Sequence, residues 1–105
     1  MISMAINPIQ DKNELTELIL GRRGGETTLK IIDNILVKPM NINQLARELG
    51  MDYNTIRYHM DKINEHDYVR KGDQKYGRLY YVSPKLKKCL KDLEQIKKHL
   101  KNQKK

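Results

Sequence analysis

Apolar positions in the middle of the chain follow two short helical patterns that a glycine separates. The first helix places three apolar residues on one face: Leu45, Ala46 and Leu49. Gly50 supplies the turn, and the second helix repeats its apolar residues at i, i+4 and i+7: Ile56, Met60 and Ile63. Asn43 and Asp52 carry short oxygen-bearing side chains just ahead of the two patterns, so we expect them to be the N-caps. Residues 43–70 therefore predict a helix-turn-helix followed by a strand.

Capping residues, glycines and prolines predict further helices before this motif. Asp11 and Glu14 have the spacing of a capping box, which opens a short helix with three inward-facing residues: Leu15, Leu18 and Ile19. Gly21, Gly24 and Gly25 end that helix. A second helix is expected from Glu26 to Pro39, with four residues facing inward: Leu29, Ile32, Ile35 and Leu36. Ile42 is expected to form a strand of one or two residues.

A hairpin is predicted directly after the helix-turn-helix. The runs 68–71 and 79–82 are typical of strands, and the segment GDQKYGR between them has the paired glycines and polar interior of a hairpin loop. Lys75 and Arg78 lie in the loop and Lys71 lies at its base, so these basic side chains can reach DNA phosphates or a minor groove. A surface hairpin can also be basic by chance.

The last part of the chain predicts a long amphipathic helix. Ser83 and Pro84 are a strong start signal, because a capping hydroxyl precedes a residue that needs no N–H at the first helical position. The apolar residues then step alternately by three and four, as in a coiled-coil seam: Leu86, Cys89, Leu93, Ile96 and Leu100. A small domain could fold this stripe onto itself, but its regularity favours pairing with a second copy. We therefore expect a homodimer through this seam.

Composition places the chain among small basic proteins. Its 105 residues predict one mostly α-helical unit with a small β-hairpin, divided into a leading segment (1–20), a winged helix-turn-helix (21–83) and a C-terminal dimerisation helix (84–105). The formal net charge is +8, and the whole excess lies in residues 51–105. Such a surface attracts polyanions, of which nucleic acid is the commonest, although tail lysines can be merely solvated.

Several classes of protein are disfavoured. Cys89 is the only cysteine, so an intramolecular disulfide is excluded and a secreted, disulfide-stapled fold is improbable. No apolar run approaches the roughly 20 residues that cross a bilayer, and no signal peptide opens the chain, so we expect a cytoplasmic protein with no membrane partner. The segment RRGGE lacks the features of a phosphate loop, and no catalytic motif is present, so we expect neither an enzyme nor a cofactor.

The polar face of the second motif helix offers the candidate DNA contacts. It carries Tyr53, Asn54, Arg57, Tyr58, Asp61 and Lys62. Asn54, Arg57 and Lys62 can bond base edges or phosphates in a major groove. Arg22 and Arg23 precede a helix N-terminus, whose unpaired N–H groups can help to bind one phosphate. The alternative for the two arginines is an ordinary surface turn.

The chain from Arg22 to Leu86 resembles the winged helix-turn-helix regulators of the ArsR type, and especially a small archaeal branch of them. The resemblance rests on four segments: RGGET, NQLARELG, DYNTIRYHMDKI and GDQKYGRLYYVSP. It implies a transcription regulator that binds DNA as a dimer. It also implies that Asn54, Thr55, Arg57 and Tyr58 face the groove.

The metal sites of that family are not carried over. Its sensing members have paired cysteines in the first motif helix, and residues 44–49 contain none. Cys89, Asp92 and His99 are spread over nearly three turns, too far apart to close one tetrahedral site within a single helix. We expect His59 to be a packed, hydrogen-bonded residue, and His66 has no partner that the sequence identifies.

The resulting hypothesis is a homodimeric, sequence-specific regulator of transcription that binds double-stranded DNA. Its partners would be DNA and a second copy of the chain, with no metal. Two alternatives stay open: a non-specific architectural DNA-binding protein, and a winged-helix module that binds proteins within a transcription complex.

Overall fold

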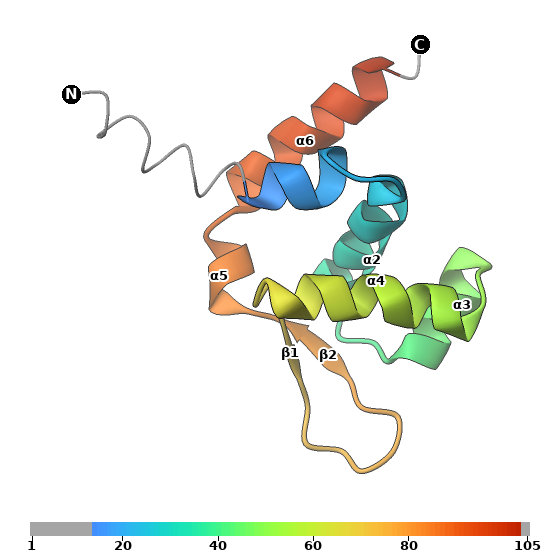
Figure 1. Cartoon of the computed structure of the whole chain (residues 1–105). Helices are drawn as coiled ribbons and strands as arrows, with labels where there is room; N and C mark the ends of the chain where they lie inside the picture. The colour runs from blue at the N-terminus through green and yellow to red at the C-terminus, as the bar shows by residue number, and fades with distance from the viewer. Residues whose placement is uncertain (1–13, 104–105) are drawn as a thin grey trace.

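The computed structural model describes residues 14–103, so the capping residue expected at Asp11 lies outside the described part. Residues 14–20 form a helix, which we call the N-terminal helix. The elements that follow are α2 (Gly25–Val37), α3 (Ile42–Leu49), α4 (Tyr53–Glu65), β1 (Val69–Lys71), β2 (Tyr80–Val82), α5 (Pro84–Lys87) and α6 (Leu90–Gln103). The hairpin projects from one end of the helices, and α6 and the N-terminal helix lie at the other end (Figure 1). The expected mostly helical fold with a small hairpin and a C-terminal helix is confirmed.

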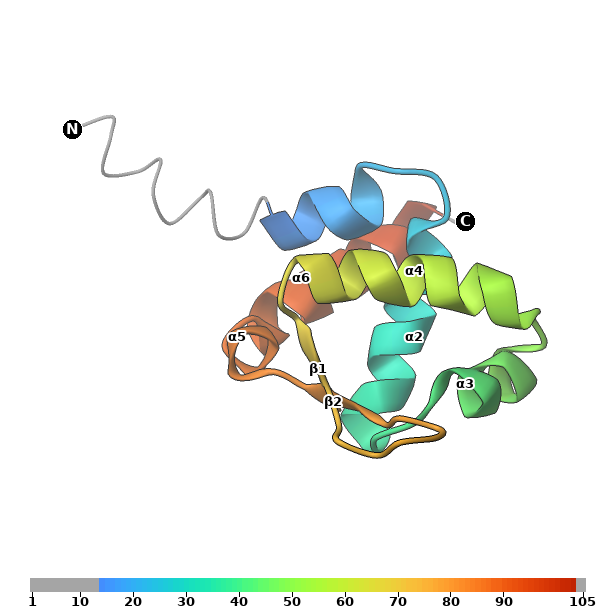
Figure 2. The same cartoon turned by 60° about the horizontal axis from the view of Figure 1, so that its bottom comes forward.

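Helix α2 lies at the centre of this arrangement and packs against α3, α4 and β2 (Figure 2). Its inward face is fully apolar apart from one threonine: Thr28, Leu29, Ile31, Ile32 and Ile35 are buried. The helix starts after Gly24, which adopts a left-handed conformation with a φ of 77°. Residues other than glycine rarely adopt this conformation. Burial of this face positions α2 against α3 and α4, the two helices of the helix-turn-helix.

The helix-turn-helix forms at the expected place, but its first cap is not the expected residue. The Asn41 side chain accepts a hydrogen bond of 2.8 Å from the Gln44 N–H, and the Gln44 side chain accepts one of 2.8 Å from the Asn41 N–H. This reciprocal capping box makes Asn41 the N-cap of α3, so the prediction for Asn43 was wrong by two residues. Gly50 closes α3 with a φ of 67°, and Asp52 caps α4, both as expected.

The hairpin is antiparallel, with Val69 opposite Val82 and Lys71 opposite Tyr80. It is also tied to the chain that enters α3, because the Tyr80 N–H donates to the Met40 carbonyl over 2.9 Å. The short strand expected at Ile42 therefore lies two residues earlier, as a single bridge at Met40, and Ile42 begins α3 instead. This additional pairing holds the hairpin, which we call the wing, beside the helix-turn-helix.

The expected single C-terminal helix is divided in two. Ser83 caps α5 through its hydroxyl, which accepts from the Leu86 N–H over 3.2 Å, and Pro84 is the first helical residue, as expected. The Cys89 N–H then bonds the Leu86 carbonyl, three residues back, which is a tighter turn than an α-helix makes. Helix α6 starts afresh at Leu90 and crosses the N-terminal helix (Figure 1).

The apolar seam of this segment packs largely against the chain's own core. Leu86, Leu93 and Ile96 are 0%, 1% and 4% exposed, and they join Leu15 and Ile19 of the N-terminal helix in one cluster of buried residues. Cys89 and Leu100 are half-buried at its edge. Three of the five side chains expected at a dimer interface are therefore already covered within one chain. None of the described helices has the length and apolar character that crossing a bilayer requires.

Candidate nucleic-acid interface

Helix α4 presents two rows of polar side chains, because residues four apart lie on the same side of a helix. The wing row faces the hairpin and consists of Tyr53, Arg57 and Asp61. The outer row lies next to it and consists of Asn54, Tyr58 and Lys62. The opposite side of α4 is buried through Ile56, Met60 and Ile63, as the sequence predicts. Core packing thus fixes which side chains α4 presents outward.

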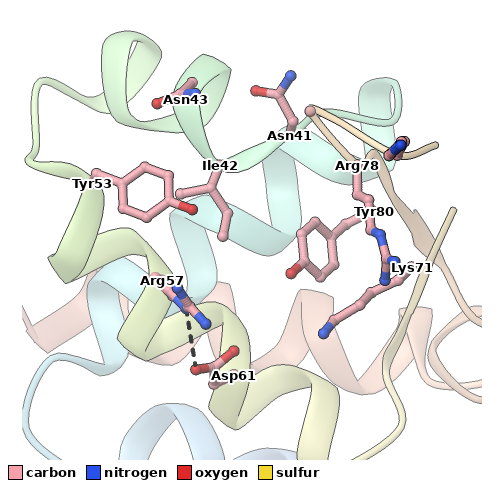
Figure 3. Close-up of a pocket in the computed structure, with 11 residues that line it drawn as sticks. Asn41, Ile42, Asn43, Tyr53, Arg57, Asp61, Lys71, Arg78 and Tyr80 are labelled. Carbon is pink, nitrogen blue, oxygen red and sulfur yellow. Dashed lines mark ion pairs between the residues drawn. The ribbon is translucent and has the colours of Figure 1, made fainter. Parts of the chain in front are cut away.

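The wing row and the hairpin enclose a cleft that is rich in positive charge. Arg57 comes from α4, and Lys71 and Arg78 come from the hairpin (Figure 3). Lys75 of the hairpin loop lines the same cleft. The start of α3 and Tyr80 also line the cleft, and the Tyr80 ring points into it (Figure 3). The structure therefore brings together one predicted cation of α4 and all three predicted cations of the hairpin.

Two interactions hold side chains at this cleft. The Arg57 Nε lies 4.0 Å from Asp61 Oδ2, one turn further along α4. In the hairpin loop, the Arg78 Nε donates to the Gln74 carbonyl over 3.1 Å. Burial raises the pKa of the Tyr80 hydroxyl, and the Asp61 carboxylate raises it further, so this hydroxyl stays protonated and can donate to an acceptor in the cleft.

The outer row continues onto the loop that precedes α2. Tyr58 is 54% exposed, and two cations lie near its ring: Lys62 Nζ at 5.6 Å and Arg22 Cζ at 5.9 Å from the ring centroid. Both distances are within the range of cation–π attraction. Arg22 also donates to the Leu18 carbonyl over 3.4 Å, whereas Arg23 is exposed. Arg22 therefore contacts a side chain of α4.

Thr55 differs from the other predicted contacts, because its polar atoms serve the N-terminus of α4. Its N–H and its hydroxyl both donate to the Asp52 carboxylate, over 3.3 and 2.5 Å. The hydrogen bond from the Thr55 side chain is the largest cause that lowers the pKa of Asp52. Thr55 would have to give up its hydroxyl bond in order to donate to DNA.

His66 has partners that the sequence did not indicate. Its Nδ1 lies 2.9 Å from Glu14 Oε2, and Lys85 Nζ lies 2.8 Å from the same carboxylate oxygen. Lys85 also donates to the His66 carbonyl over 2.8 Å, and its hydrogen bond to Glu14 lowers the pKa of that carboxyl. This cluster joins the N-terminal helix, the end of α4 and α5. No local pattern could have revealed it, because Glu14 is 52 residues from His66 and 71 from Lys85.

Among residues 14–103, no three or more His, Cys, Asp or Glu side chains gather closely enough to hold a metal ion. Apart from the Asp61 carboxylate, the polar side chains at the cleft are cations, amides and hydroxyls, which suit anionic oxygens and base edges. The chemistry available at this face is hydrogen bonding and charge attraction.

Comparison with known proteins supports the fold. No protein-family profile and no curated protein matches the sequence. Thirteen chains of solved structures are similar, and two of them illustrate the likeness. The first is the transcriptional regulator BldR from Sulfolobus solfataricus, with a TM-score of 0.67, 18% identity, 98% of this chain covered and 77% of that chain. The second is a MarR family protein from Bacillus stearothermophilus, with a TM-score of 0.61, 11% identity, and coverage of 94% and 72%. At these identities the likeness shows the fold, which is a winged helix-turn-helix.

Proposed function

We propose that this protein is a regulator of transcription that binds double-stranded DNA sequence-specifically as a homodimer. The observation that carries the proposal is the cleft in which Arg57 of α4 meets Lys71, Lys75 and Arg78 of the hairpin. Four cations around a groove formed by an exposed helix and a loop suit a duplex, because a base-reading element stands next to a phosphate-binding one. The structural similarity to BldR, which is a transcriptional regulator, supports the same role.

In the proposed complex, α4 lies in the major groove and the hairpin lies along the adjacent backbone. The wing row and the outer row then meet base edges and phosphates on either side of α4, with Arg57 and Asn54 as the main base-reading candidates. Lys75 and Arg78 meet phosphates. At the outer row, Arg22 and Lys62 both lie near the Tyr58 ring, so a second basic edge can follow the opposite backbone strand.

The homodimer is proposed because one winged helix makes few base contacts, whereas two copies read a symmetric site. Burial of Leu86, Leu93 and Ile96 in one chain directs the interface to the remaining surface of α6. Leu90 is 41% exposed there, and Leu100 is half-buried. Membership of the ArsR type and of its archaeal branch belongs to the same proposal and rests on the four sequence segments alone.

Selection of bound fragments from random duplex DNA tests this function against its two alternatives. A regulator enriches a defined inverted repeat with half-sites about one helical turn apart, or a multiple of it. Enrichment of duplex without any motif would favour an architectural DNA-binding protein. An absence of binding at low salt would favour a protein-interaction module. A protein with Arg57, Lys75 and Arg78 all replaced by Ala is the control, since it retains the buried face of α4.

A further inference from the structure

One acidic side chain stands in the basic cleft between α4 and the hairpin. Of the described residues that line this cleft, four are cations and Asp61 alone is acidic. A carboxylate that faces a phosphate backbone weakens binding through like-charge repulsion. Its presence in a proposed DNA-binding surface therefore needs a compensating role.

The geometry of Asp61 indicates what that role is. Its Oδ2 lies 4.0 Å from the Nε of Arg57, and the two residues are one helical turn apart in the wing row. The contact uses Nε, so the two terminal nitrogens of the guanidinium lie outside it. Figure 3 shows the Arg57 side chain directed along α4 toward Asp61, with the Tyr80 ring across the cleft. With Nε engaged by Asp61, both terminal nitrogens remain available for the two parallel hydrogen bonds of a fork-shaped contact.

We propose that Asp61 is a positioning residue, which holds the Arg57 guanidinium for a bidentate contact with a guanine edge and so sets base specificity at that position. The proposal rests on the proposed function, because it assumes that α4 reads DNA. The fork of an arginine matches the O6 and N7 acceptors of guanine, and no other base offers this pair in the major groove. An arginine without a fixed direction reaches phosphates as readily as bases.

The effect of Asp61 is expected in the complex and not in the free protein. The Arg57 and Asp61 side chains are 61% and 51% exposed, and ion pairs of this kind contribute little in water. Bound DNA would displace water from the cleft, which lowers the effective dielectric constant and strengthens the pair. Asp61→Asn should therefore fold like the wild-type protein, which a thermal melt checks directly.

Binding to the selected site and its single-base changes tests the proposal. Arg57→Ala first identifies the guanine at which base preference is lost. At that position Asp61→Asn should reduce the preference for guanine by about threefold or more, as expected for two coupled residues. Asp61→Glu should retain most of the preference, because a carboxylate four residues from an arginine can still pair with it.

In the double variant with Arg57→Ala, Asp61→Asn should cause no further loss. Replacing the guanine by 7-deazaguanine, which lacks N7, should weaken wild-type binding more than Asp61→Asn binding.

Glu65→Gln is the matched control, because it removes one negative charge from the same helix, where Glu65 pairs with Lys62 over 3.9 Å. If Asp61→Asn strengthens binding to all sequences as Glu65→Gln does, and the guanine preference is unchanged, Asp61 acts only as a repelling charge and the proposal is overturned. If the wild-type protein binds DNA without base preference, or does not bind it, the proposed function itself fails. Those two outcomes are read from the wild-type protein alone, before any variant is compared.

Discussion

Thr28 of α2 and His59 of α4 share a buried polar contact, with Thr28 Oγ1 3.3 Å from His59 Nδ1. Both side chains lie between α2 and α4, where Thr28 is 0% exposed and His59 is 8% exposed. Gly24 lies against the imidazole ring, where an added Cβ would come 2.8 Å from its Cε1. This histidine is therefore a packed and hydrogen-bonded residue, as the sequence predicted.

We expect the protein to lose stability as the pH falls below about 6.5, the ordinary pKa of histidine. Burial lowers the pKa of His59, and the positive charge of Arg22 lowers it further. In this pH range the unfolded chain takes up a proton that the folded chain does not, so protonation favours unfolding. The contribution of neutral His59 to stability is complete above the pKa that histidine has in the unfolded chain. It declines as the pH falls from there to the lower pKa of His59 in the folded chain. Urea denaturation at pH 8, 7, 6 and 5 measures the decline.

His59→Asn serves as the control for this prediction, because an amide can keep one hydrogen bond without titrating. The variant should be less stable at pH 8 and should show a smaller decline toward pH 5 than the wild-type protein. Glu14, whose pKa is also lowered, loses its contribution only below the ordinary pKa of a glutamate, so the two ranges are separable. An equal decline in the wild-type and variant proteins would assign the effect to other groups.

A second prediction concerns the first cap of the helix-turn-helix. Asn41→Ala removes a capping side chain and leaves the Gln44 N–H without its acceptor, so it should lower the free energy of unfolding by about 0.5–2 kcal/mol. Asn43→Ala changes an exposed residue in the first turn of α3 and should cost clearly less. Chemical denaturation of the two variants side by side gives the comparison. A larger cost at Asn43 would contradict the assigned cap.

The two asparagines show how far local sequence carries. Both stand before the same apolar pattern, and a short polar residue ahead of a helix does not by itself fix the cap. The useful signal was Gln44, three residues after Asn41, which completes a capping box. Gly50 and Asp52 were predictable because each is dictated by its immediate neighbours. Local patterns thus fix the elements, with an error of about one or two residues at their ends.

Features that depend on distant residues were not predictable in this way. The division of the C-terminal helix at Cys89 follows no glycine or proline, and it allows α5 to stay beside the wing while α6 crosses the N-terminal helix (Figure 1). The seam that resembles a coiled coil is equally suited to the chain's own core, because burial requires only an apolar face. The pairing of Arg57 with Asp61 was within reach of the sequence, since it is an i, i+4 contact.

The third prediction separates folding from assembly on α6. Leu93 is 1% exposed, so Leu93→Ala should lower the free energy of unfolding by about 2–5 kcal/mol through lost contacts and a cavity. Leu90 is 41% exposed, so Leu90→Asp should leave that free energy within about 1 kcal/mol of the wild-type value. We expect Leu90→Asp to weaken the proposed homodimer, because a charge would enter an apolar contact. Sedimentation velocity at several concentrations measures this, and an unchanged dimer would place the interface on another surface.

The last prediction concerns the hairpin loop, where Lys75 and Arg78 are exposed at the edge of the cleft. Side chains that meet phosphates contribute equally to all sequences, so Lys75→Ala and Arg78→Ala should weaken specific and unrelated duplexes by similar factors. Each replacement should also make the negative slope of log affinity against log salt less steep by about one, because one fewer counterion is released. Asp73→Asn, a neutralised charge in the same loop, should leave the slope almost unchanged or raise it slightly. Fluorescence anisotropy between 50 and 200 mM salt measures all three slopes. A slope that both cation replacements leave unaltered would show that the wing does not lie along the DNA backbone.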